Sequence, residues 1–193
     1  MRNIAIFASG SGTNAENLIN YFSNRNTAKV TLILSNKREA FVLKRAAALK
    51  VRSVFFDRKE LYVTEKVLRY LLLYKIDFVV LAGFLWLIPG NILNLYQGRI
   101  INIHPALLPR YGGKGMYGPR VHEEVIKNRD PESGITIHYV NEYYDEGDII
   151  FQARCRVDPA DTVDSLAEKV HALEYDHFPE IVEELVSKLP DFT

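Results

Sequence analysis

Short apolar runs alternate with longer amphipathic stretches along the first half of the chain. Four runs have the composition of strands buried on both faces: NIAIFA from Asn3, KVTLILS from Lys29, RSVFF from Arg52 and DFVVLAG from Asp77. RIINIHP adds a fifth strand, and the intervening spacing predicts helices over residues 14–24, 40–50 and 59–74. This alternation indicates right-handed crossovers and a parallel sheet. The helix over 40–50 is expected to turn its apolar residues toward the core, namely Phe41, Leu43, Ala46, Ala47 and Leu49.

The pattern changes after the fifth strand. A glycine-rich loop, RYGGKGMYG, leads to a predicted helix over residues 119–127. GITIHYV and DIIFQARCRV follow, and the NEYYDEG between them is too short for a helical crossover, so these strands are expected to pair antiparallel. A last helix is predicted from about Thr162 to Lys188, with Asp161 or Thr162 as its N-cap. The expected fold is therefore α/β and Rossmann-like. It has a mostly parallel twisted sheet of about seven strands, flanked by helices, with an antiparallel pair near the C-terminal edge.

Composition narrows the class of protein. The chain has 193 residues, of which 48% are apolar, and no repeat or linker divides it, so a single domain over residues 1–193 is expected. Lys+Arg and Asp+Glu are both 24, which argues against a nucleic-acid partner bound through bulk charge. No targeting segment or spanning run is visible, which favours a cytoplasmic protein without a membrane partner. The lone Cys155 excludes an internal disulfide and a cysteine-based zinc cluster. Either a monomer or a homodimer fits this composition.

The first predicted strand runs into Gly10-Ser11-Gly12-Thr13-Asn14-Ala15. Glycines before a helix let backbone N–H groups face an anion, although this spacing also fits an ordinary strand-to-helix turn. A dinucleotide site further requires a carboxylate about 20 residues on, to hold the ribose. The second strand ends instead in Leu34-Ser35-Asn36-Lys37, without a carboxylate. Thr13 and Asn14 add side-chain donors, so the loop favours a single compact phosphate over NAD.

Asn102 and His104 are two residues apart in the fifth strand, so their side chains leave the same face. Pro105 ends the strand there, at the carboxyl end where open α/β sheets bind ligands. An amide beside an imidazole is a pair that acyl transfer uses to stabilise an oxyanion, whereas a lone histidine at a strand end can also be structural. Asp145, two residues before Gly147, either shapes the turn between the last two strands or lies against His104. In the second case it would raise the pKa of the imidazole.

Four segments occur in a fixed order along the chain: SGSGTN, LAGF, INIHPALLPRY and GITIHYVNEYYDEGDII. Together they resemble the folate-dependent glycinamide ribonucleotide formyltransferases (phosphoribosylglycinamide formyltransferases) of purine synthesis. The resemblance runs from Met1 to about Leu185, and its most specific part is Gly134–Val157. It implies transfer of a formyl group from 10-formyltetrahydrofolate, a co-substrate, to the amine of glycinamide ribonucleotide. It implies no metal and no redox cofactor.

The resemblance also implies roles for individual residues. Asn102, His104 and Asp145 match the catalytic trio of the family: imidazolium and amide stabilise the oxyanion, and the carboxylate supports His104 and aids proton transfer through water. His138 matches a histidine that supports this site. The Leu108–Pro109 bond matches one that is cis in relatives.

Substrate contacts are implied in the same way. Gly12, Thr13 and Asn14 match residues that bind the phosphate, and Glu174 matches a contact to the ribonucleotide. The folate pocket is expected to be lined by Leu85, Trp86, Leu87, Ile88 and Asn102, with the backbone of residues 141–145 contacting the pterin. Lys59 or Arg58 would meet the folate tail, and Trp86 stands where relatives often carry arginine. The four glycines over 112–118 suggest a mobile flap.

Two alternatives stay open on the sequence alone. Other folate-dependent formyl enzymes share the Asn/His/Asp set, including methionyl-tRNA formyltransferases, formyl-folate hydrolases and sugar formyltransferases with a different amine acceptor. The tRNA and hydrolase members usually carry an added domain, for which 193 residues leave no room, and the phosphate loop disfavours a hydrolase. The other alternative is a nucleotide-binding module without chemistry, which would have no use for the Asn102/His104 pair.

Overall fold

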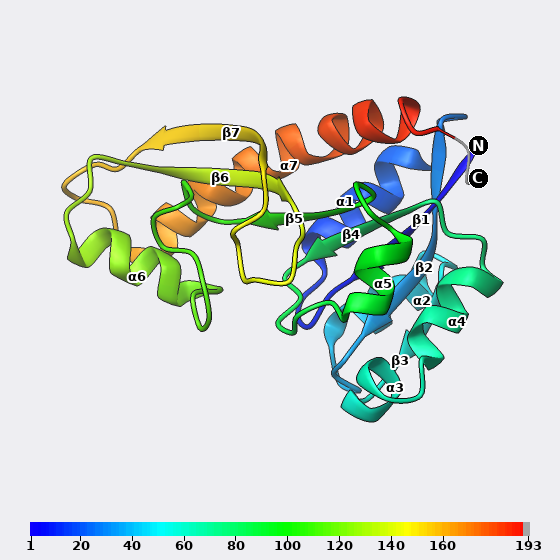
Figure 1. Cartoon of the computed structure of the whole chain (residues 1–193). Coiled ribbons are helices and arrows are strands. Elements are labelled where there is room, and N and C mark those ends of the chain that lie inside the picture. Colours follow the sequence, from blue (N-terminus) through cyan, green and yellow to red (C-terminus); the bar gives the residue numbers. More distant parts are fainter. Residues whose placement is uncertain (191–193) are drawn as a thin grey trace.

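A seven-stranded mixed sheet organises the part of the chain that the computed structural model describes, residues 1–190. Its strands lie in the order β3-β2-β1-β4-β5-β6-β7 (Figure 1). They are β1 (Arg2–Phe7), β2 (Ala28–Ser35), β3 (Arg52–Phe55), β4 (Phe78–Ala82), β5 (Ile100–His104), β6 (Glu132–Tyr139) and β7 (Ile149–Arg156). Strands β1 to β5 pair in parallel, and β6 pairs antiparallel with both β5 and β7. The predicted sheet, with its antiparallel pair at the C-terminal edge, is confirmed.

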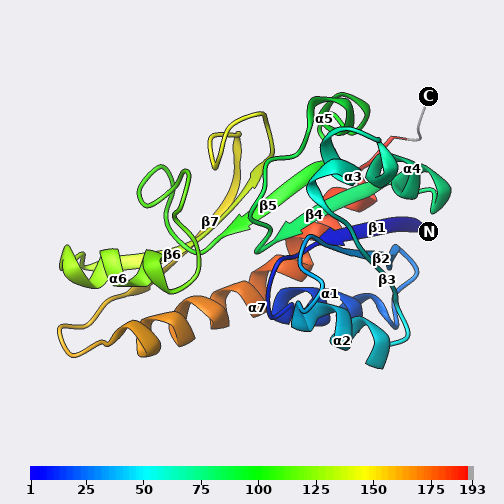
Figure 2. The same cartoon turned by 90° about the horizontal axis from the view of Figure 1, so that it is seen from below.

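Helices cover both faces of this sheet (Figure 2). One face carries α1 (Thr13–Phe22), α2 (Phe41–Ala48) and α7 (Val163–Ser187), with α6 (Pro119–Lys127) packed beside α7. The other carries α3 (Arg58–Tyr62), α4 (Lys66–Leu73) and α5 (Gly90–Leu95). Along β1, Ile4 and Ile6 enter the core on the α1–α7 side, whereas Ala5 and Phe7 enter the opposite core. This period of two explains why the inner strands are continuous apolar runs.

The predicted helix over residues 59–74 is wrong in one respect, because the structure has two helices there. Asp57 and Glu60 form a capping box that starts α3. Glu65 then adopts φ 55°, in the left-handed region that interrupts a helix, and α4 begins after it. At the other end of the chain, Thr162 caps α7 as predicted, again through a capping box.

The expected inward face of α2 is only partly confirmed. Ala46 is buried, and Leu43 and Leu49 pack against the core, as predicted. Phe41 is 50% exposed and Ala47 is exposed, so these two are wrong, and Val42 is buried instead. The helix is turned by its contact with the opening loop: the Val42 N–H donates to the Gly10 carbonyl at 3.1 Å, and a Cβ on Gly12 would lie 2.4 Å from Val42 Cγ2. The sequence analysis predicted no helix at the position of α5.

The carboxyl ends of β1, β4 and β5 meet at one edge of the sheet. Buried Ser9, just after β1, joins the segments there: its Oγ donates to Asn36 Oδ1 at 2.7 Å and accepts from the Leu85 N–H at 3.1 Å. The opening loop is therefore fixed relative to the segment after β4. Within residues 1–190, no helix is both long and apolar enough to cross a membrane.

Candidate active site

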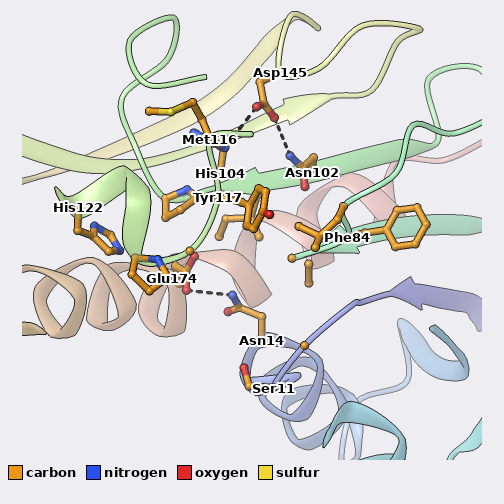
Figure 3. Close-up of a pocket in the computed structure, with 18 of the residues that line it drawn as sticks. Ser11, Asn14, Phe84, Asn102, His104, Met116, Tyr117, His122, Asp145 and Glu174 are labelled. Atoms are coloured by element: carbon orange, nitrogen blue, oxygen red, sulfur yellow. Dashed lines mark hydrogen bonds and ion pairs between the residues drawn. The ribbon is translucent and has the colours of Figure 1, made fainter. Parts of the chain in front are cut away.

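A cavity of about 650 Å³ lies at this edge of the sheet (Figure 3). Its walls come from the opening loop, the segment after β4, the end of β5, the 113–119 loop, the β6–β7 turn and the inner side of α7. Gly12, Thr13, Asn14, Asn102, His104, Asp145 and Glu174 all line it. The structure thus brings together residues that are up to 162 positions apart, between Gly12 and Glu174 (174 − 12).

Gly12 sits at the N-cap of α1 with φ 75°, a conformation that glycine adopts without strain. The contact with Val42 leaves no room for a side chain at this position. Arg45 supports the loop from α2: its Nε donates to the Ser11 carbonyl at 2.9 Å, and its guanidinium pairs with Glu16. The loop is consequently held with the positive end of α1 facing the cavity, which suits an anion.

Glu174 meets this loop from the middle of α7. Its side chain is buried and accepts hydrogen bonds from Asn14 Nδ2 at 3.0 Å and His171 Nδ1 at 2.8 Å. The contact with Glu174 raises the pKa of His171, against the smaller opposing effect of burial. Two polar atoms nearby, Asn14 Oδ1 and His122 Nδ1, are buried and have no hydrogen-bond partner within the part of the chain that the structure describes. They are donors or acceptors that a bound ligand can satisfy.

Asn102, His104 and Asp145 form a compact cluster on the opposite side of the cavity (Figure 3). Asp145 Oδ2 is 3.5 Å from His104 Nδ1 and accepts the Gly113 N–H at 2.9 Å. Asp145 Oδ1 accepts a hydrogen bond from Asn102 Nδ2 at 3.2 Å. Asp145 has φ 57°, a left-handed conformation that aspartate tolerates better than most residues, and this turn directs its carboxylate at His104. The aspartate therefore contacts the histidine and does more than shape the turn.

His138 completes the cluster from β6, directly opposite Asn102 in the strand pairing. Its Nδ1 donates to the Tyr139 carbonyl at 2.8 Å, so in the neutral ring Nε2 is an acceptor, 3.1 Å from Asn102 Nδ2. The two amide hydrogens of Asn102 thus face Asp145 and His138. These two contacts fix the NH2 end of the Asn102 amide toward His138 and Asp145.

Burial has the largest effect on the pKa of His104. His104 is only 4% exposed, and desolvation lowers its pKa below 6.5, outweighing the negative charge of Asp145, which acts in the opposite direction. Asp145 thus raises the pKa of His104 as expected, but in the substrate-free protein the larger effect of burial makes the net shift downward. For Asp145 itself, burial raises the pKa, but contacts with His138, His104 and the Gly113 N–H outweigh it and lower the pKa below 3.8. The carboxylate is ionised at neutral pH.

The residues expected to bind folate divide into two groups. Leu85 and Trp86 line the cavity, whereas Ile88 is buried in the core on the α3–α5 side and Leu87 is not part of the lining. Of the two basic residues, Arg58 lines the cavity and stacks 5.0 Å from the centroid of the Trp86 ring; Lys59 is not in the lining.

Several lining residues were missed by sequence reasoning, namely Phe84, Met116, Tyr117, His122 and His171. His171 had a usable signal, because it precedes Glu174 by one helical turn and so shares its face. The 113–118 segment borders the cavity, and its mobility stays a prediction. The Leu108–Pro109 bond is cis, as the resemblance implied. No cluster of three or more His, Cys, Asp or Glu side chains suited to a metal ion occurs in the described chain.

Known proteins share this architecture. A family model described as formyl transferase matches residues 2–182. The phosphoribosylglycinamide formyltransferase of Bacillus subtilis is 33% identical over 191 residues, covering 96% of this chain and 95% of that protein. The crystal structure of the phosphoribosylglycinamide formyltransferase from Anaplasma phagocytophilum matches with a TM-score of 0.88 and 32% identity, over 97% of this chain and 87% of the other. The Bacillus halodurans enzyme matches with a TM-score of 0.86 and 36% identity, over 97% and 96%.

Proposed function

The chain belongs to the formyl transferase family, and we propose that it transfers the formyl group of 10-formyltetrahydrofolate to the amine of glycinamide ribonucleotide. The products are formylglycinamide ribonucleotide and tetrahydrofolate, as a step of de novo purine synthesis. One observation supports this most directly: the phosphate loop and the Asn102–His104–Asp145 cluster open into the same cavity. An acceptor held by its phosphate can therefore present its amine to groups suited to acyl transfer.

Binding of the ribonucleotide is assigned to the α1 side of the cavity. Gly12, Thr13 and Asn14 bind the phosphate through backbone N–H groups and side-chain donors, assisted by the α1 dipole. Glu174 is placed to accept hydrogen bonds from the ribose hydroxyls. The unpartnered Asn14 Oδ1 supports binding of the ribonucleotide here, because this buried acceptor gains a hydrogen bond when a ribose hydroxyl donates to it.

Folate is assigned to the space between β4 and the β6–β7 turn. Leu85 and Trp86 supply apolar contacts, and the backbone of residues 141–145 supplies polar ones for the pterin. Leu87 and Ile88 contribute from behind as packing, not as direct contacts. Arg58 replaces Lys59 as the proposed cation for the folate tail, because Arg58 lines the cavity and, among the described residues, no carboxylate pairs with it through a hydrogen bond or ion pair.

The reaction begins when the substrate amine attacks the formyl carbon and a C–N bond forms, leaving negative charge on the formyl oxygen. Imidazolium at His104 and the Asn102 amide stabilise this oxyanion, and the oxyanion replaces His138 as a partner of the amide. The bond from the formyl carbon to N10 of the folate then breaks. The amine loses one proton and N10 gains one, relayed by Asp145 and water, so the protons balance. The developing negative charge favours the imidazolium that burial alone disfavours.

The wider assignments belong to the same proposal. Residues 1–193 act as a single formyltransferase domain in the cytoplasm, as a monomer or homodimer, on small-molecule substrates and without a nucleic-acid or membrane partner. The cores on both faces of the sheet share its strands, which supports one domain.

The test follows the conversion of 10-formyltetrahydrofolate to tetrahydrofolate by absorbance, with and without glycinamide ribonucleotide, for the wild type and His104→Ala. We expect turnover that requires the ribonucleotide and falls by about a thousandfold in the variant. Deformylation without the acceptor would identify a formyl-folate hydrolase instead. Folate binding without turnover in either case would indicate a different amine acceptor.

A further inference from the structure

His104 has a second neighbour that the proposed reaction does not use. Its Nε2 lies 2.7 Å from the backbone carbonyl of Tyr111. A carbonyl oxygen can only accept, so Nε2 carries a hydrogen in both the neutral and the charged ring. Only Nδ1, the nitrogen that faces Asp145, is then left to gain or lose a proton. Whatever holds the Tyr111 carbonyl in place therefore selects the tautomer of the histidine.

The backbone around Tyr111 is built for this contact. Tyr111 adopts φ 57°, a left-handed conformation that is strained for a non-glycine residue and needs support from its surroundings. Two residues later, the Gly113 N–H donates to Asp145 Oδ2 at 2.9 Å. The three residues Tyr111–Gly113, here called the bracket, thus hold His104 with a carbonyl and Asp145 with an N–H.

The bracket is anchored on its outer side by the Tyr111 phenol. Its hydroxyl donates to Asp130 Oδ2 at 2.5 Å and accepts from Asn128 Nδ2 at 2.9 Å. Asp130 is buried between α6 and β6, and its other oxygen accepts from Arg110 Nη2 at 2.8 Å. Burial and the bond to Asp130 both raise the pKa of the Tyr111 phenol, so it remains a donor throughout the neutral range.

We propose that Tyr111 and Asp130 are positioning residues of the formyl-transfer site: their hydrogen bond fixes the bracket, which keeps hydrogen on His104 Nε2 and leaves Nδ1 as the nitrogen that titrates against Asp145. Neither side chain touches substrate in this assignment, because both act through the backbone of the bracket. The inference rests on the proposed function for its kinetic consequence, but its structural part concerns the substrate-free protein.

Asp145 opposes this selection, because its carboxylate lies 3.5 Å from Nδ1 and favours hydrogen there, whereas the 2.7 Å bond to the Tyr111 carbonyl requires hydrogen on Nε2 of His104. Asp145 of the β6–β7 turn, His138 of β6, Glu174 of α7 and His122 of α6 are the titratable groups whose charges affect it. Each alters how readily His104 is protonated. Within residues 1–190, only the Tyr111 carbonyl is hydrogen-bonded to an imidazole nitrogen of His104. The choice between the two nitrogens is therefore made at the bracket.

The test combines Tyr111→Phe with a matched control, Tyr21→Phe. Tyr21 also donates its hydroxyl to a carboxylate, Glu183 Oε2 at 2.7 Å, but it packs between α1 and α7 away from the cavity. We expect Tyr111→Phe to lower kcat about tenfold while both KM values change less than about twofold. Tyr21→Phe should leave kcat and KM unchanged. Each of the two variants loses one hydrogen bond from a tyrosine to a carboxylate, so both should lower Tm by a similar amount. Asp130→Ala should behave like Tyr111→Phe, and Asp130→Asn, which retains an acceptor, should recover most of kcat.

The tautomer is measured directly by ¹⁵N NMR of histidine in the substrate-free protein, at a pH where His104 is neutral. The wild type and Tyr21→Phe should show hydrogen on Nε2 alone, and Tyr111→Phe should show a mixture of both tautomers. A single unchanged tautomer in Tyr111→Phe, or kcat within about twofold of the wild type, would overturn the inference. Absence of formyl transfer in the wild type would instead count against the proposed function, and the NMR result would still decide the role of Tyr111.

Discussion

The two sides of the cavity are built differently, although both are lined by polar side chains (Figure 3). On the β5 side, Asp145 contacts both Asn102 and His104, Asn102 also contacts His138, and the bracket holds His104 and Asp145. On the α1 side, Glu174 holds Asn14 and His171, but Asn14 Oδ1 and His122 Nδ1 have no partner. A buried polar atom without a partner costs about 1–3 kcal/mol, so the second arrangement gains when a ligand supplies hydrogen bonds.

This difference indicates a division of work. A group that must stabilise developing charge acts best when its orientation is fixed beforehand, because no energy is then spent on reorientation during the reaction. A group that binds substrate can leave part of its hydrogen-bonding capacity for the ligand. We therefore expect substitutions on the β5 side to change kcat and substitutions on the α1 side to change KM.

The largest effect is expected at Asp145. Asp145→Asn keeps the shape of the side chain but removes the charge that faces His104 at 3.5 Å and the strongest acceptor of the proton relay. We expect kcat to fall by about 10²–10³-fold with little change in KM for the ribonucleotide, measured by steady-state formyl transfer.

Asp148→Asn is the matched control, because this exposed carboxylate lies in the same turn but outside the cavity lining. Its kinetics should equal those of the wild type. A rise in KM for the ribonucleotide in Asp145→Asn, with kcat retained, would show that the two sides do not divide the work as stated.

A smaller effect is expected at Glu174. Glu174→Gln removes the charge that orders Asn14 and His171 while it preserves the volume of the buried side chain. A hydrogen bond to a charged group contributes about 1.5–3 kcal/mol, so we expect KM for the ribonucleotide to rise about tenfold, with kcat within about threefold of the wild type.

Glu183→Gln provides the comparison on the same helix, since Glu183 accepts hydrogen bonds from Tyr21 and Thr27 and does not line the cavity. It should affect thermal stability but not KM. If Glu174→Gln reduced kcat and left KM alone, Glu174 would belong functionally with the β5 side.

Local patterns in the sequence were sufficient for the sheet and for part of the site. The apolar runs gave the strands because an inner strand is buried on both faces, and Asn102 and His104 share a face because strand geometry has a period of two. The strand end Leu34-Ser35-Asn36-Lys37 holds no carboxylate, which favoured a phosphate loop over a dinucleotide loop, and this stays a prediction. These inferences need only neighbouring residues.

The features of the fold and site that the sequence did not predict depend on contacts between distant segments. The helix over 59–74 breaks at Glu65, and α2 turns Val42 inward, because each is fitted against another element. Arg58 rather than Lys59 faces the cavity because the α3 capping box fixes where that short helix begins. The direction of the His104 pKa shift depends on burial and on charges from several elements, so the sequence alone could not predict it. A role for Asp130 became visible only from its hydrogen bond with Tyr111.

The smallest effect is expected in the pH dependence of stability, where two histidines on the α1 side differ in sign. Burial, followed by repulsion from His171, lowers the pKa of His122 below 6.5, so below pH 6.5 the unfolded chain binds more protons than the folded one. Acidification through that range thus destabilises the fold at His122. His171 has a raised pKa through Glu174, so its stabilisation is complete below pH 6.5 and is lost as the pH rises through its folded value.

The two histidines can be separated by measuring Tm at about pH 5.5 and 7.5 for the wild type, His122→Asn and His171→Asn. His122→Asn removes a site that opposes folding in acid, so Tm should fall less on acidification than in the wild type. His171→Asn removes a site that favours folding in acid, so Tm should fall more. The His171 effect should be the smaller one because its side chain is 53% exposed and water screens its pairing with Glu174. Shifts of the same sign in both variants would contradict the view that His122 is buried without a partner while His171 is held by Glu174.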